Sequence, residues 1–227
     1  MKPLIIISPS VNNSEEELTL SRAYCRAIEK AGGLPLATDY SSAEDLIKIA
    51  DGVLLSGGGD IDPQRTGDIP DLKAQGQISA ARDEFEFKLL NLALKEDIPV
   101  LGICRGMQVI GAFYRGHIIQ HIEGHRQNVD RNQTFHEVQI KKDTLLYKIV
   151  GKDKLSVNSF HHQAVEDSFS GVISAWDDGI IEAVELNEKS FVLGVQWHPE
   201  YLCETEEHFN IFKTFVNAAV SKKGRKK

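Results

Sequence analysis

Long apolar runs are absent from this 227-residue sequence, and cysteine is scarce. The apolar run near the N-terminus covers only a few residues, too few for the core of a signal peptide or for a membrane span. Cys25, Cys104 and Cys203 are odd in number and widely spaced, which argues against a disulfide framework. No dinucleotide fingerprint or phosphate loop occurs, so we expect no cofactor. These absences predict a cytoplasmic protein.

Positive charge is in deficit: the sequence has 26 Lys and Arg against 33 Asp and Glu, which gives a net charge of −7. This balance argues against a nucleic-acid-binding surface or an anionic-membrane surface. The basic run KKGRKK is the exception, and we expect it to form a disordered tail at about residues 223–227. The length, and the lack of repeats and linkers, predict a single domain over residues 1–227.

Strand-like and helix-like segments alternate in the first half of the chain. Apolar runs predict buried strands at residues 4–8, 34–38, 52–56 and 99–103. Helices are expected over residues 14–33, 41–50, 78–95 and 104–113. Ser14 would cap the first of these helices, with three glutamates in its first turn. This alternation is typical of a parallel sheet covered by helices on both faces.

The second half of the chain is richer in strands. The expected strands cover residues 135–140, 154–159, 171–176, 180–186 and 191–196. Asp178-Gly179 predicts a tight hairpin turn between two of them. A last helix is expected over residues 204–222, with Phe209, Phe212, Val216 and Ala219 on its inward side. These elements together predict an α/β protein.

A cysteine stands at the junction between a predicted buried strand and a predicted helix. Cys104 has glycines two residues before and after it, Gly102 and Gly106, as in a nucleophile elbow. The helix N-terminus would favour the thiolate form of the sulfur. The Arg105 N–H would point towards an oxyanion formed beside Cys104. The alternative is a buried cysteine at a strand end, with the glycines serving only a tight turn.

A cysteine nucleophile needs a histidine to take and return a proton. Among eight histidines, His198 has the best context, because it follows an apolar strand and precedes Pro199. Glu200 lies two residues further on, where its carboxylate can reach the imidazole ring. The alternative is an ordinary surface turn after a strand.

Three other histidines recur at steps of four residues, which suggests a metal site. They are His117, His121 and His125, but Gly116 and Gly124 weaken any helix through them. Imidazoles without a defined geometry are weak support for a metal. We therefore expect no metal here.

Several motifs together resemble a known family. The segments GICRGMQ, GVQWHPE and LLSGGGD look like the signatures of class I glutamine amidotransferases. ARDEFEF, NSFHHQAV and DDGIIEAVE resemble the γ-glutamyl-γ-aminobutyrate hydrolase branch of that superfamily, the peptidase C26 group. The similarity runs from Leu4 to the C-terminal helix.

The resemblance implies a flavodoxin-like, three-layer α/β/α fold with a central, mostly parallel sheet and additional hairpin strands in the second half. It implies that Cys104 attacks a γ-glutamyl carbonyl to form a thioester, with His198 as base and then acid and Glu200 orienting it. The oxyanion hole would comprise the Arg105 N–H and one N–H from the loop Gly57-Gly58-Gly59, with Gly58 favoured.

The resemblance also assigns residues to substrate binding. They are Gln108, Gly59, His161, His162 and Gln163, and the alternative for the last three is a purely structural polar turn. The segment after the elbow and the short loop at 61–77 depart from the family pattern, which leaves the leaving amine open.

Three functions are consistent with these residues. The first is a stand-alone hydrolase of a small γ-glutamyl amide, which ARDEFEF and NSFHHQAV favour. The second is a glutaminase subunit that delivers ammonia to a separate synthase. The third is a non-catalytic binding protein on the same fold. The sequence leaves open whether the chain forms a homodimer.

Overall fold

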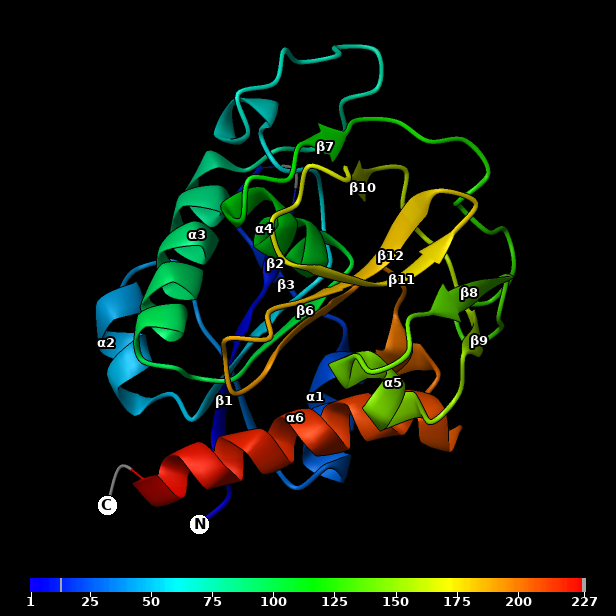
Figure 1. Ribbon diagram of the computed structural model, residues 1–227. Coiled ribbons are helices and arrows are strands. Elements are labelled where there is room, and N and C mark those ends of the chain that lie inside the picture. The colour runs from blue at the N-terminus through cyan, green and yellow to red at the C-terminus, as the bar shows by residue number, and fades with distance from the viewer. Residues whose placement is uncertain (13, 226–227) are drawn as a thin grey trace.

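A nine-stranded mixed sheet forms the middle layer of the computed structural model, which describes residues 1–12 and 14–225 (Figure 1). Its strand order is β4-β1-β5-β6-β13-β12-β11-β8-β9. The parallel half comprises β4 (Leu34–Ala37), β1 (Leu4–Ser8), β5 (Gly52–Leu55), β6 (Val100–Ile103) and β13 (Val192–Val195). The antiparallel half comprises β12 (Ile180–Glu185), β11 (Val172–Asp177), β8 (His136–Ile140) and β9 (Lys154–Val157).

Helices cover both faces of the sheet. One face packs against α1 (Arg22–Lys30), α5 (Leu145–Val150) and α6 (Glu206–Arg225), and the other against α2 (Ala43–Ile49), α3 (Ala80–Lys95) and α4 (Arg105–Phe113). Side chains of β1 alternate between these two cores, with Ile5 and Ile7 on the first face and Ile6 on the second. The predicted three-layer α/β/α fold is therefore confirmed.

The predicted helix start at Ser14 is wrong. β2 (Ser10–Val11) and β3 (Leu18–Thr19) pair as a small hairpin, and α1 begins at Arg22 behind a Ser21 cap. The Asn12 side-chain oxygen accepts hydrogen bonds from the backbone N–H groups of residues 16 and 17. This local turn provides the amide partners that a helix N-terminus would otherwise need.

The predicted tail is also wrong for residues 223–225, which continue α6, while residues 226–227 lie outside the described part. The Lys223 ammonium lies 2.8 Å from an Asp51 carboxylate oxygen and donates to the carbonyl of Lys2 at 2.9 Å. The same Asp51 oxygen accepts from the N–H of Leu4. The last described turn of α6 is thus joined to the first residues at the amino end of β1 (Figure 1).

The carboxyl ends of β1, β5, β6 and β13 meet at the opposite edge of the sheet. Ligands of open α/β sheets bind at this edge. The short elements nearby are β7 (Ile118–Ile119), β10 (Ala164–Val165) and the 3₁₀ turns η1 (Pro63–Arg65) and η2 (Pro199–Tyr201). Within residues 1–12 and 14–225, no helix combines the length and apolar character needed to span a membrane.

Candidate active site

Cys104 stands in a strained turn between β6 and α4. Its φ of 54° and ψ of −106° lie outside the regions that non-glycine residues favour. A Cβ on Gly106 would lie 2.1 Å from the Leu55 carbonyl oxygen, and one on Gly102 would lie 2.5 Å from the Gly106 carbonyl oxygen. Both glycines are therefore required by close backbone approach, as in the predicted elbow.

His198 and Glu200 form a buried pair on the loop after β13. The His198 Nδ1 lies 2.7 Å from a Glu200 carboxylate oxygen. The Asn158 side chain accepts from the His198 N–H at 2.8 Å and donates to the His198 carbonyl at 3.0 Å. Because a carboxylate only accepts, Nδ1 carries the hydrogen, which leaves Nε2 able to exchange a proton.

The His198 ring and the Cys104 side chain meet beside Gly57. A Cβ placed on Gly57 would lie 2.9 Å from His198 Cε1 and 3.5 Å from Cys104 Cβ. Burial of the ring disfavours its charge, but the Glu200 carboxylate and the Cys104 sulfur raise the pKa of His198 well above its usual value. The structure thus brings together the three residues predicted as a triad.

The loop after β5 supplies one candidate for binding an oxyanion. The Gly57 N–H already donates to the Tyr24 hydroxyl at 3.0 Å. The N–H groups of Gly58 and Arg105 donate to no acceptor within the described part of the chain. Gly58 is therefore the better candidate of the two predicted glycines, together with Arg105 at the start of α4.

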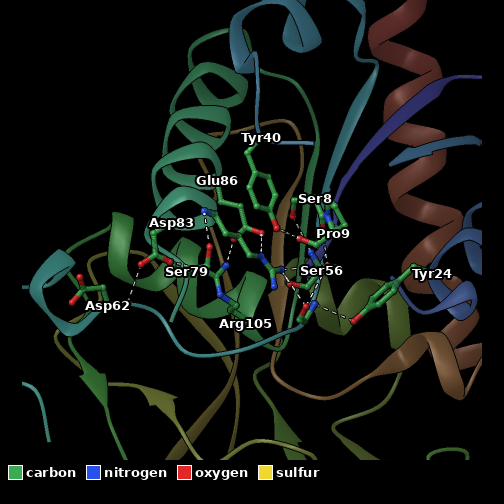
Figure 2. Close-up of polar contacts among 12 residues, drawn as sticks. Ser8, Pro9, Tyr24, Tyr40, Ser56, Asp62, Ser79, Asp83, Glu86 and Arg105 are labelled. Carbon is green, nitrogen blue, oxygen red and sulfur yellow. Dashed lines mark hydrogen bonds and ion pairs between the residues drawn. The ribbon is translucent and has the colours of Figure 1, made fainter. Parts of the chain in front are cut away.

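A buried charge network lies beneath the elbow (Figure 2). The Arg105 guanidinium pairs with the carboxylates of Asp83 and Glu86, and the Arg82 Nε lies 2.8 Å from Glu86. All four side chains are buried. Burial opposes ionisation of Glu86, but Arg105 and Arg82 hold the pKa of Glu86 below its usual value.

The same network reaches the glycine loop. Arg82 Nη2 donates to the carbonyls of Ser56 at 2.8 Å and Gly57 at 3.1 Å. A Cβ on Gly58 would lie 1.9 Å from Arg82 Nη1, so the loop lies directly against the guanidinium. The ARDEFEF segment therefore connects the Cys104 elbow with the candidate oxyanion loop, a role that the sequence did not predict.

The five residues predicted to bind substrate lie away from the cleft wall. The Gln108 amide donates to the Gln163 carbonyl at 3.1 Å and to the Gln196 side chain at 3.2 Å. His162 Nε2 lies 3.0 Å from an Asp60 oxygen. Gln108 thus holds the 161–163 loop rather than facing the cleft.

The other two predicted residues also have neighbours outside the cleft. A Cβ on Gly59 would lie 2.3 Å from the Gln77 carbonyl oxygen. His161 Nδ1 lies 2.9 Å from the Gln163 carbonyl, and its Nε2 faces Glu182. A contact from any of the five to a substrate stays a prediction.

A cleft of about 420 Å³ opens above Cys104 and His198. Sequence patterns did not predict several of the side chains that line it: Tyr24, Arg126, Arg131, Phe160 and Tyr201. The Arg131 guanidinium stacks 5.3 Å from the ring centroids of Phe160 and Tyr201 and donates to the Tyr201 hydroxyl at 3.1 Å. Tyr24 lies on α1, Arg126 and Arg131 lie between β7 and β8, Phe160 follows β9 and Tyr201 ends η2, so no local motif connects them.

Comparisons with known proteins agree with this fold and geometry. The chain is 33% identical over 225 residues to Schizosaccharomyces pombe PB2B2.05, provisionally named a glutamine amidotransferase, covering 95% of this chain and 86% of that one. It is 32% identical over 206 residues to the γ-glutamyl-γ-aminobutyrate hydrolase PuuD of Escherichia coli K12, covering 81% of this chain and 79% of that one.

A solved structure resembles the fold over the whole chain. It is a Thermoplasma acidophilum protein provisionally named as one of the subunits of a GMP synthase, with a TM-score of 0.70 at 15% identity, covering 100% of this chain and 98% of that one. This likeness concerns the fold alone. The peptidase C26 family model matches residues 5–200, which is most of the chain. This protein belongs to the peptidase C26 family, within the class I glutamine amidotransferase-like superfamily.

Proposed function

We propose that this protein hydrolyses γ-glutamyl amide bonds through a thioester on Cys104. The family and the named relatives support a hydrolase of carbon–nitrogen bonds with a glutamine amidotransferase-like or γ-glutamyl hydrolase function. The proposal rests on one observation: a strained Cys104 shares a cleft with the His198–Glu200 pair.

The first step forms the thioester. The Cys104 thiol gives its proton to His198 Nε2, and the thiolate attacks the γ-carbonyl carbon. The carbonyl oxygen becomes an oxyanion beside the N–H groups of Gly58 and Arg105. The His198 imidazolium gives its Nε2 proton to the leaving nitrogen as the carbon–nitrogen bond breaks. A free amine departs, and the γ-glutamyl group stays on sulfur.

The second step releases glutamate. Neutral His198 takes a proton from a water molecule, whose oxygen attacks the thioester carbon. The carbon–sulfur bond breaks, and the Cys104 sulfur leaves as a thiolate stabilised by the imidazolium. Glu200 holds the ring in the tautomer that both steps need.

The charge of the cleft favours a leaving amine that carries a carboxylate. Arg126 and Arg131 line the cleft, and stacking on two rings holds Arg131 in a defined position. A guanidinium binds a carboxylate through two parallel hydrogen bonds. PuuD is named for γ-glutamyl-γ-aminobutyrate, whose amine carries such a carboxylate. We therefore propose a γ-glutamyl-amine substrate of this class.

A panel of γ-glutamyl amides tests this function. We expect glutamate release from γ-glutamyl-γ-aminobutyrate to exceed release from glutamine, with a γ-glutamyl adduct on Cys104 detectable by mass spectrometry. Arg131→Gln should raise KM for the carboxylate-bearing substrate about tenfold and change that for a neutral γ-glutamyl amine little, because one charged hydrogen-bonding partner is lost. Arg26→Gln, on the exposed side of α1, is the matched control.

The other outcomes of the panel identify the alternatives. Release from glutamine only, increased by a separate synthase, would indicate a glutaminase subunit. If no substrate yields glutamate and no adduct forms, the protein is a non-catalytic binding protein and the proposal is wrong.

Replacing Glu200 by Gln should reduce kcat/KM by about 10²-fold or more, because an oriented base contributes that much. The Glu200 charge raises the pKa of His198. Its loss lowers that pKa, so the imidazolium deprotonates at lower pH and the alkaline limb of the kcat/KM profile moves to lower pH. Glu204→Gln, on an exposed neighbour, should leave the profile unchanged. An alkaline limb that stays in place in Glu200→Gln would contradict this assignment.

A further inference from the structure

Three imidazoles converge on one buried carboxylate outside the cleft. The ring nitrogens His125 Nδ1, His136 Nε2 and His161 Nε2 lie 3.5, 3.5 and 3.4 Å from Glu182 Oε1. Glu182 is fully buried, and the three histidine side chains are at most 14% exposed. We call these four residues the His–Glu cluster.

Five polar atoms of the His–Glu cluster have no hydrogen-bond partner within the described part of the chain. This holds for both Glu182 carboxylate oxygens and for the nitrogen that each histidine directs at them. Leaving one such buried group unpaired is costly, and five of them gather at a single point here. A positive charge beside Glu182, on an imidazolium or on a bound cation, would offset this cost.

A single imidazolium would balance the Glu182 charge, but it would pair only one of the three nitrogens with that carboxylate. Three imidazoliums around Glu182 would carry three positive charges against one negative charge, with Asp177 as the next carboxylate, 4.0 Å from His136 Nε2. A neutral imidazole would point either a lone pair or an N–H at the carboxylate. At nitrogen-to-oxygen separations of 3.4–3.5 Å even an N–H would be at the limit of hydrogen bonding. One dication bound by three neutral imidazole nitrogens and by Glu182 Oε1 would pair four of these five atoms.

The separations match those between ligands of a metal. With bonds of about 2.0–2.1 Å, neighbouring ligand atoms of a tetrahedral zinc site lie about 3.3–3.4 Å apart. Three of the nitrogen-to-oxygen separations are 3.4–3.5 Å. The ligand atoms of His125, His136 and Glu182 also lie within 4.8 Å of one another. That group does not include His161, so the His161 ring would have to move towards the other two histidines to complete a four-ligand site.

The orientation of His161 agrees with a ligand role. Its Nδ1 lies 2.9 Å from the Gln163 carbonyl, and a carbonyl only accepts, so Nδ1 carries the hydrogen. The lone pair of Nε2 then faces the His–Glu cluster. A metal-bound histidine usually donates its other ring N–H to such an oxygen, which fixes the ring.

We propose that His125, His136, His161 and Glu182 bind a first-row transition-metal dication, with Zn²⁺ as the best fit. Imidazole and carboxylate ligands suit this class of ion. Four protein ligands leave no open position, so the ion stabilises the structure rather than reacting. The expectation of a metal-free protein, made from His117, His121 and His125, is thereby revised: only His125 of that trio takes part.

The proposed ion would fix the loop that supports His198. Asn158, whose side chain bonds the N–H and the carbonyl of His198, begins a short segment that ends at His161, a proposed metal ligand. Glu182 is also connected to the His198 loop directly. The Gln196 N–H, two residues before His198, donates to the Glu182 carbonyl at 2.8 Å. This site stands whether or not the proposed hydrolase activity does.

Metal analysis of the full-length chain, purified without chelator or a histidine tag, tests the proposal. We expect about one zinc per chain, removal by a strong chelator, and a rise in Tm when Zn²⁺ is returned. Co²⁺ added to the metal-free protein should give the intense visible absorption of a four-coordinate site.

Two variants locate the ion. His136→Gln and His125→Gln should each weaken Zn²⁺ binding by more than the roughly 10–100-fold that loss of an outer partner costs. His121→Gln, an exposed histidine close in sequence, should bind as the unaltered chain does. If neither Zn²⁺ nor Co²⁺ binds, the His–Glu cluster is a protonated histidine network. If both variants bind metal normally, the ion is elsewhere. Either result overturns the proposal.

Discussion

Cys104→Ala should reduce the hydrolysis of γ-glutamyl amides by at least about 10⁴-fold, because removal of a covalent nucleophile leaves only the binding groups. The measurement is glutamate release under saturating substrate, together with the disappearance of the adduct from the mass spectrum. A fluorescence or circular dichroism melt should show that the variant folds.

The other two cysteines provide matched controls. Cys203 follows His198 closely in sequence, but burial raises the pKa of its thiol to about 12, so it carries no thiolate at neutral pH. Cys25 lies on α1 and does not line the cleft. Cys25→Ala and Cys203→Ala should therefore keep kcat within about twofold, a change worth less than about 0.5 kcal/mol of barrier. Full activity in Cys104→Ala would end the thioester mechanism.

Glu86→Gln should lower the free energy of unfolding by about 3–5 kcal/mol, since breaking a buried ion pair leaves its partner charge uncompensated. Glu86 neutralises both Arg82 and Arg105, and all three side chains are buried. The loss should be measured by urea unfolding, with the slope of the transition unchanged.

The same substitution should also reduce activity at temperatures where the variant is folded. Arg82 holds the carbonyls of the loop that precedes Gly58, and Arg105 begins the helix behind Cys104. Glu44→Gln, which removes an exposed pair with Lys88, should change neither stability nor activity measurably. Equal stability of the two variants would show that the buried charges contribute little.

Local patterns predicted much of this fold. The buried strands before Cys104 and His198 are continuous apolar runs, and the glycines beside Cys104 are a spacing that sequence alone displays. The start of α1 was not predicted, because the glutamates at 15–17 imitate a first helical turn. The deciding hydrogen bonds come from Asn12, and several residues can make such a turn.

Long-range pairings were beyond the reach of sequence patterns. Gln108 follows Cys104 by one turn of α4, and this spacing predicts its position on the helix. The spacing does not predict its hydrogen-bond partners Gln163 and Gln196, which lie far away in sequence. The pairing of Arg105 with Asp83 and Glu86 joins two helices across 19–22 residues of chain. The four-residue spacing of His117, His121 and His125 would bring these side chains together only on a helix, and no helix forms there. Their actual neighbours lie on other strands and loops.

The join between Lys223, Asp51 and the first residues has a practical consequence. Lys2 and Lys223 lie at the amino end of β1, whereas Cys104 and His198 follow the carboxyl ends of their strands. An affinity tag or a fluorescent fusion at either end would therefore project away from the cleft. For the same reason a short linker could close the chain into a ring, and new ends could be opened in an exposed loop to make a circular permutant.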